Sequence, residues 1–135
     1  MERIREMIQT HPNRPEGDAD ALAASIAACC ECVSTCLSCA DACLHEDDPK
    51  SLAYCIRTDM DCADICAATG RILSRASRPD AATMAALLEA CATACRSCAD
   101  ECQKHADMHD HCRVCAETCL HCEEQCQRLL QVTPS

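Results

Sequence analysis

The chain has almost none of the large side chains that usually fill a protein core. Its 135 residues include no Phe, no Trp and a single Tyr, and Leu, Ile and Val together number 19. Such a composition with high net charge is typical of disorder, but only 2 residues are Gly and apolar residues recur with a helical period. Cysteine, at 18 residues, replaces the missing core residues, because a free thiol packs like a small hydrophobe.

Excess positive charge and long apolar runs are also missing. The net charge of −10 argues against nucleic acid and anionic membranes as partners. No stretch approaches the ~20 apolar residues that span a bilayer, and Met1 to Gln9 lacks the apolar centre of a signal peptide. We therefore expect a cytoplasmic protein whose thiols stay reduced. A disulfide scaffold is typical of secreted, loop-rich chains, which this sequence does not resemble.

Seventeen of the eighteen cysteines are spaced by three, four or seven residues within four segments, which puts them on one face of each of four helices. They are Cys29, Cys32, Cys36, Cys39, Cys43, Cys55, Cys62, Cys66, Cys91, Cys95, Cys98, Cys102, Cys112, Cys115, Cys119, Cys122 and Cys126. Only Cys30 departs from the pattern, by about 100° on a helical wheel. The pattern predicts four helices that turn their thiols inward.

Turn and capping signals divide the chain, which we treat as one domain over 1–135, into a short N-terminal helical segment and four helices. The expected ranges are 1–17 for the N-terminal segment, 18–45, 49–75, 78–106 and 107–131 for the helices. A capping box at Ser77–Asp80 and a cap at Asp107 mark the last two starts. The short connections predict an all-α, up-down-up-down four-helix bundle with a cysteine-lined core.

This topology gives the bundle two different poles. One pole gathers polar side chains and soft or borderline metal ligands: His45, Tyr54, His105, Met108, His109 and His111. The other pole gathers apolar side chains: Leu22, Ile26, Ile72, Leu73, Met84, Leu87, Leu88, Leu129 and Leu130. The layout predicts a vessel with one mouth, at the His/Met pole.

Buried thiolates cannot remain as uncompensated anions, so the metal-free core must hold neutral thiols. A monovalent soft cation that replaces each proton keeps that neutrality, and soft thiolates favour Cu(I). Residues four apart have Cβ atoms roughly 5–6 Å apart, close to the ~4.6 Å that two linear metal–sulfur bonds span, so one Cu(I) could bridge each of seven CxxxC pairs. With bridging sulfurs the capacity approaches one Cu(I) per cysteine, about 18 per chain.

Four further groups join the eighteen cysteines, including Cys30, as candidate metal ligands. On the helical wheel Met108 lies on the cysteine stripe of the fourth helix. His105 lies within about 60° of the cysteine stripe of the third helix, and His111 within about 60° of that of the fourth. Asp59 fills the place between Cys55 and Cys62 where the spacing calls for a cysteine, and we assign it to metal access or to proton transfer from the thiols. His45, His109 and His121 are expected at the surface.

Three alternatives remain at this point: a zinc protein, an iron–sulfur protein and a thiol redox buffer. Zinc and clusters need closed sets of four thiolates, the ferredoxin spacing is absent, and zinc knuckles lie on turns rather than mid-helix. A redox enzyme needs one activated CxxC at a helix N-terminus, and none of the CxxC spacings here stands out.

The sequence resembles the bacterial copper storage proteins, in particular their cytosolic branch. The resemblance covers about residues 18 to 131, through the cysteine motifs of 29–43, 62–66, 91–102 and 112–126 and the His/Met mouth. It implies a four-helix bundle that stores many Cu(I) ions on core cysteines, without catalytic turnover, and a homotetramer. Copper ions, with a copper chaperone as candidate donor, are the expected partners.

Overall fold

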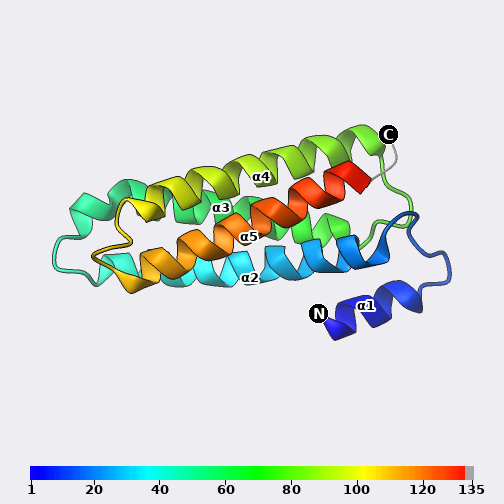
Figure 1. Ribbon diagram of the computed structural model, residues 1–135, viewed down its shortest axis with the longest axis horizontal. Coiled ribbons are helices and arrows are strands. Elements are labelled where there is room, and N and C mark those ends of the chain that lie inside the picture. Colours follow the sequence, from blue (N-terminus) through cyan, green and yellow to red (C-terminus); the bar gives the residue numbers. More distant parts are fainter. Residues whose placement is uncertain (133–135) are drawn as a thin grey trace.

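Four long helices lie side by side and alternate in direction (Figure 1). They are α2 (Ala19–Leu44), α3 (Ala53–Leu73), α4 (Ala81–Gln103) and α5 (Asp110–Val132). In this computed structural model, which describes residues 1–132, α2 and α4 each pack against both α3 and α5. The prediction of an all-α, up-down-up-down four-helix bundle is therefore confirmed, because the inward cysteine stripes can all meet along one axis.

The N-terminal segment forms a separate short helix, α1 (Glu2–Gln9), which packs against α2 (Figure 1). Ile8 is buried against the core and Ile4 is partly buried beside it. An ion pair of 3.1 Å joins Arg5 to Asp20 at the start of α2. The apolar side of α1 thus extends the core beyond the bundle itself.

The helix starts differ from those predicted. Pro49–Leu52 form a 3₁₀ turn, and the α-helix begins only at Ala53. α4 begins at Ala81 rather than at 78, because Asp80 is its N-cap and accepts a hydrogen bond from the Thr83 N–H at 3.0 Å. α5 begins at Asp110 rather than at Asp107.

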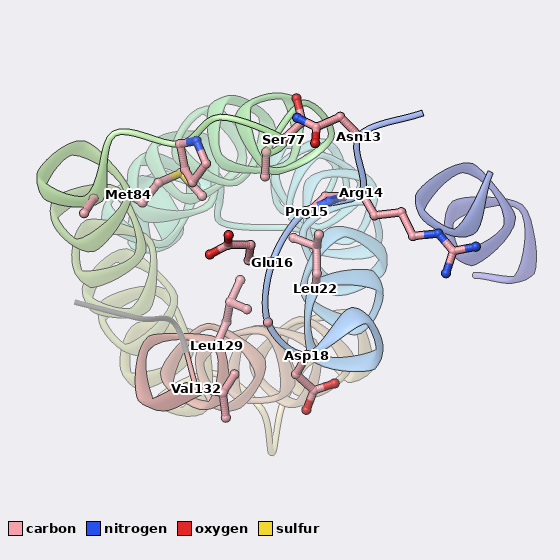
Figure 2. Close-up of a pocket in the computed structure, with 14 residues that line it drawn as sticks. Asn13, Arg14, Pro15, Glu16, Asp18, Leu22, Ser77, Met84, Leu129 and Val132 are labelled. Atoms are coloured by element: carbon pink, nitrogen blue, oxygen red, sulfur yellow. The ribbon is translucent and has the colours of Figure 1, made fainter. Parts of the chain in front are cut away.

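The pole opposite the histidines is closed by leucine. Leu22, Leu73, Leu88 and Leu129 are buried there, one from each long helix. Beyond them the segment around Glu16 passes over the end of the bundle. Together with apolar side chains of α2, α4 and α5 it lines a partly open pocket of about 430 Å³ (Figure 2). The predicted apolar plug is therefore present.

Among the described residues one helix, α2, is long and apolar enough to cross a membrane by length and composition, contrary to the expectation from the sequence that no stretch would be. Half of its most apolar 18-residue window is buried inside the bundle. A core helix of a soluble bundle has the same properties, so this feature alone does not identify a membrane span.

The cap at Asp80 provides a test of the α4 start. We expect Asp80→Ala to lower the free energy of unfolding of the metal-free protein by about 1 kcal/mol, because the first turn loses its side-chain acceptor. The measurement is reversible urea unfolding followed by circular dichroism under reducing conditions. Asp64→Ala, at an exposed position inside α3, is the control. Equal losses in both variants would show that Asp80 does not act as a cap.

Candidate metal centre

The core of the bundle is a column of sulfur. All seventeen stripe cysteines are buried, and Cys30 is the single exposed one. The inward-facing period of three and four places them there, while the 100° offset of Cys30 turns its side chain to the outer face of α2. Cys30, which the sequence also offers as a candidate ligand, is therefore separated from the other seventeen thiols.

Thiols of different helices approach one another as closely as thiols of one helix. Cys36 Sγ lies 3.6 Å from Cys119 Sγ on α5, and 3.7 Å from Cys32 Sγ on its own helix. Cys66 Sγ on α3 lies 3.6 Å from Cys95 Sγ on α4. With metal–sulfur bonds of about 2.3 Å, a trigonal site has sulfurs about 4.0 Å apart and a linear site about 4.6 Å. The spacing suits three-coordinate, cross-helix sites better than the linear CxxxC bridges expected from sequence.

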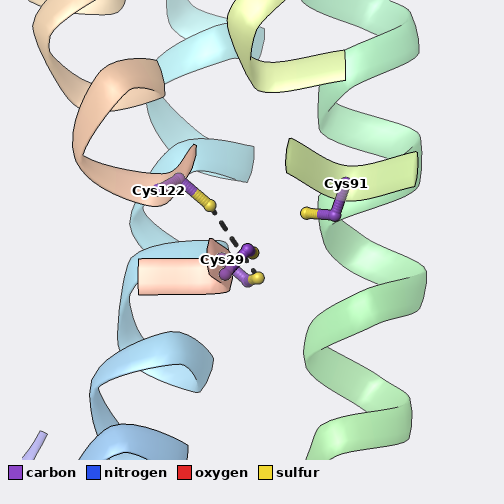
Figure 3. A group of neighbouring side chains, drawn as sticks. Cys29, Cys91 and Cys122 are labelled. Carbon is purple, nitrogen blue, oxygen red and sulfur yellow. Dashed lines mark hydrogen bonds between the residues drawn. The ribbon is translucent and has the colours of Figure 1, made fainter. Parts of the chain in front are cut away.

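Groups of four thiols overlap along the column. In each group all sulfur atoms lie within 4.8 Å of one another, and the groups include Cys29/Cys91/Cys122/Cys126, Cys32/Cys66/Cys95/Cys122, Cys32/Cys36/Cys62/Cys119 and Cys36/Cys98/Cys115/Cys119. Figure 3 shows three members of the first group, from α2, α4 and α5, with their sulfur atoms directed toward one another. Because neighbouring groups share members, metals that filled them would have to share bridging thiolates.

Burial keeps thiols near the histidine pole of this column neutral in the reduced, metal-free protein. Burial is the main cause that raises the pKa of Cys43 to about 11, and it also raises the pKa of Cys112. A thiol with such a pKa carries its proton at neutral pH. Metal binding must therefore displace protons from the column.

Asp59 is a carboxyl group completely buried among these thiols. Its Oδ1 accepts hydrogen bonds from Cys98 at 3.1 Å, Cys115 at 3.2 Å and Cys102 at 3.5 Å. Its Oδ2 is buried and has no hydrogen-bond partner within residues 1–132. Burial, with the neighbouring sulfurs as a smaller cause, raises the pKa of Asp59 to about 12. Asp59 is therefore a neutral acid in the metal-free core and lies inside the column rather than at its rim.

The mouth is built around His111, at the start of α5. Its Nδ1 lies 3.4 Å from Cys39 Sγ and 3.7 Å from Cys112 Sγ, and its Nε2 lies 2.7 Å from Glu46 Oε2. With Cys43, these residues form a mixed thiol–imidazole group whose ligand atoms lie within 4.8 Å of one another. The structure thus brings His111 to the column, as the wheel predicted.

The other predicted mouth residues behave differently. Met108 lies before the first residue of α5 and is 79% exposed, so extrapolating the stripe to it was wrong. His105 is half-buried beside Glu101, with Nε2 3.1 Å from Oε2, and no contact to a thiol is seen among the described residues. His109, expected at the surface, is half-buried and lies 3.1 Å from Glu46.

Two carboxylates at the mouth, Glu46 and Glu101, were not found from the sequence. Neither residue was among the candidate site residues predicted from the sequence. For Glu101 a signal existed, since it precedes His105 by four residues on the same helix face. For Glu46 none did, because its histidine partners are more than sixty residues away.

A helical bundle with a thiol column and one imidazole-lined pole defines a metal-sequestering protein. A sequence model of the copper storage proteins matches residues 18–131, and the chain therefore belongs to the copper storage protein family. No curated protein matches the sequence.

Solved structures of family members agree with this assignment. The copper storage protein Ccsp from Streptomyces lividans, loaded with 10 copper equivalents, is 50% identical over 96% of this chain and 99% of its own, with a TM-score of 0.94. A five-copper form, described as a cytosolic copper storage protein of the same organism, is 53% identical over 85% and 96%, with a TM-score of 0.83. Cu(I)-bound Csp3 from Bacillus subtilis is 39% identical over 79% and 95%, with a TM-score of 0.71.

The burial of Asp59 makes a prediction about pH. An aspartate ionises near pH 3.9 in the unfolded chain, whereas Asp59 keeps its proton in the folded protein until about pH 12. Folding therefore takes up a proton, and the contribution of Asp59 to stability falls as the pH rises between these values. Asp59→Asn removes this dependence, so it should stabilise the metal-free protein more at about pH 8 than at about pH 5.

The measurement is the melting temperature of the reduced variant and of the parent protein at both pH values. The other titrating groups are common to both proteins, so their contributions cancel in the difference. A difference that does not change with pH would mean that Asp59 is not a neutral buried acid.

Proposed function

We propose that this chain stores Cu(I) in the cytosol and thereby protects the cell from free copper. The observation that carries the proposal is the column of seventeen buried thiols, in which neighbouring four-thiol groups share sulfur atoms. Each Cu(I) ion that enters replaces a thiol proton, so RSH and Cu⁺ give RS–Cu and H⁺, and the buried column stays neutral. A relative that is described as cytosolic and that was loaded with copper supports both copper as the stored ion and the cytosol as the compartment. The function needs no catalytic turnover.

Zinc storage is the strongest competing function, because four sulfurs within 4.8 Å could also form a tetrahedral site. Each closed Zn(II) site with four thiolates carries a net charge of −2, which is costly to bury. Cys32, Cys36, Cys119 and Cys122 each belong to at least two groups, so neighbouring zinc sites could be closed only by sharing thiolates. Shared sulfurs fit bridged Cu(I) better than separate zinc ions.

Within this function we assign the seventeen stripe cysteines as copper ligands and His111 as a ligand at the mouth. The position of Asp59 among three thiols, with Oδ2 lacking a hydrogen-bond partner among the described residues, supports a role as an additional ligand or as a relay that passes thiol protons on. We also keep His105 and Met108 as residues that guide copper to the mouth, although neither touches a thiol among the described residues. Cys30 is left out of the storage site because it is exposed.

A homotetramer and a copper chaperone as donor complete the proposal. Apolar side chains on the outer faces of the helices support self-association, among them Leu37, Met60 and Val114, each more than 40% exposed. The half-exposed Glu46, His109 and His111 at one pole give a donor a place to deliver copper.

A copper titration tests the storage function. Anaerobic addition of Cu(I) to the reduced protein, against a chelator of known affinity, should reach a plateau above about ten ions per chain, with the thiols protected from reagent. Cys30→Ser should leave the plateau unchanged, whereas the matched change Cys32→Ser should lower it. A plateau of about four ions or fewer would reject storage in favour of zinc, clusters or redox chemistry.

Copper access at the histidine pole has a separate test. Replacing His105, Met108 and His111 together by Ala should slow Cu(I) loading in stopped-flow experiments but keep most of the plateau, because the column remains. His121→Ala, at an exposed position on α5, is the control. Loading at the parent rate in the triple variant would show that copper enters elsewhere.

A further inference from the structure

Glu46 holds two histidines with one oxygen atom. It lies in the connection after α2, and its Oε2 is 2.7 Å from His111 Nε2 and 3.1 Å from His109 Nδ1. The two imidazole rings stack with their centres 5.5 Å apart and their planes 18° apart. Glu46 therefore ties the end of α2 to the start of α5 across the mouth.

The contact with Glu46 decides which nitrogen of His111 carries the proton. A carboxylate only accepts hydrogen bonds, so His111 Nε2 must donate to it. In the neutral ring Nδ1 then has a free lone pair, and this atom is the one that lies against Cys39 and Cys112. The lone pair accepts from a thiol in the metal-free protein, and it would face a metal ion that replaced the thiol proton.

This arrangement is the one that orients histidine ligands in many metal sites. A carboxylate bound to the second ring nitrogen fixes the tautomer and the ring plane, and its loss commonly lowers metal affinity 10- to 100-fold. The side chain of Glu46 is 30% exposed, and a glutamate in contact with solvent is ionised at neutral pH. The carboxylate can therefore accept the hydrogen bond, as the contact requires.

The mouth contains a second carboxylate–histidine pair that serves as a comparison. Glu101 accepts from His105 at 3.1 Å and from Lys104 at 3.1 Å, all within α4 and the turn that follows it. No contact between His105 and a thiol is seen in residues 1–132. The Glu101 pair thus has the same chemistry at the same pole without the link to the sulfur column.

We propose that Glu46 is a positioning residue, which fixes His111 as the Nε2–H tautomer and aims Nδ1 at the Cys39/Cys43/Cys112 group. This group is then preorganised as the first Cu(I) site at the mouth. Glu46 itself does not bind the metal. The inference rests on the proposed copper storage function, which it deepens by naming the site that is loaded first.

The first test is made on the metal-free protein and needs no copper. Long-range proton–nitrogen NMR of the reduced protein, at a pH high enough for the ring to be neutral, should show His111 protonated on Nε2 alone. In Glu46→Ala the ring should become a mixture of the two tautomers. In Glu46→Gln the mixture should be smaller, because the amide oxygen can still accept from Nε2–H. Glu101→Gln should leave His111 unchanged.

The second test is the rate of loading of the first copper equivalents. We expect Glu46→Ala to reduce it about 10-fold, Glu46→Gln to reduce it less, and Glu101→Gln to leave it within about 2-fold of the parent protein. The plateau at saturation should stay the same in all three variants, because no core thiol is changed. If Glu46→Ala loses helicity, Glu46→Gln carries both tests by itself.

The inference is overturned if His111 keeps the pure Nε2–H tautomer in both Glu46 variants. It is also overturned if their first-equivalent rates match that of Glu101→Gln. A low copper plateau in the parent protein would instead reject storage, and the NMR result would still stand on its own. The two failures are therefore distinguishable.

Discussion

The structure depends on keeping a buried column of sulfur electrically neutral. Seventeen thiols fill the space that leucine, valine and phenylalanine occupy in most bundles, and an uncompensated thiolate there would lose most of its solvation energy. The column is neutral when each sulfur holds a proton, and it is neutral again when each proton has been exchanged for Cu(I). The two poles of the bundle and its acidic side chains can be understood by their roles in this exchange of protons for Cu(I).

The two poles of the bundle have different roles in this exchange. At one pole a single layer of leucines, Leu22, Leu73, Leu88 and Leu129, seals the column with residues that have no affinity for copper. At the other pole imidazole replaces leucine and reaches the sulfurs directly, through His111. Because proton release and copper uptake both need contact with solvent, we propose that the exchange takes place at the second pole and that the ions then move inward between overlapping sulfur groups.

The regular parts of this design could be predicted from the sequence, and the irregular parts could not. The spacing of the cysteines predicted the four-helix bundle, the inward-facing thiols and the position of Cys30 off the common face. Helical geometry alone decides which side chains share a face. The same rule failed for Met108, which lies before the start of α5, where a wheel no longer applies. Glu46 was missed because its partner His111 lies on another element, and no local pattern records such a contact.

The different burial of Glu46 and Asp59 gives these two acidic side chains different protonation states. Glu46 is half-exposed and faces two imidazoles, which stabilise its charge, so it can act as a fixed acceptor. Asp59 lies among thiols without solvent, and burial forces it to keep its proton. A neutral acid amid neutral thiols adds one more exchangeable proton to the column, so copper that displaced it would leave the charge balance unchanged. The replacement of a cysteine by an aspartate in the α3 stripe thus obeys the same constraint of neutrality as the thiols around it.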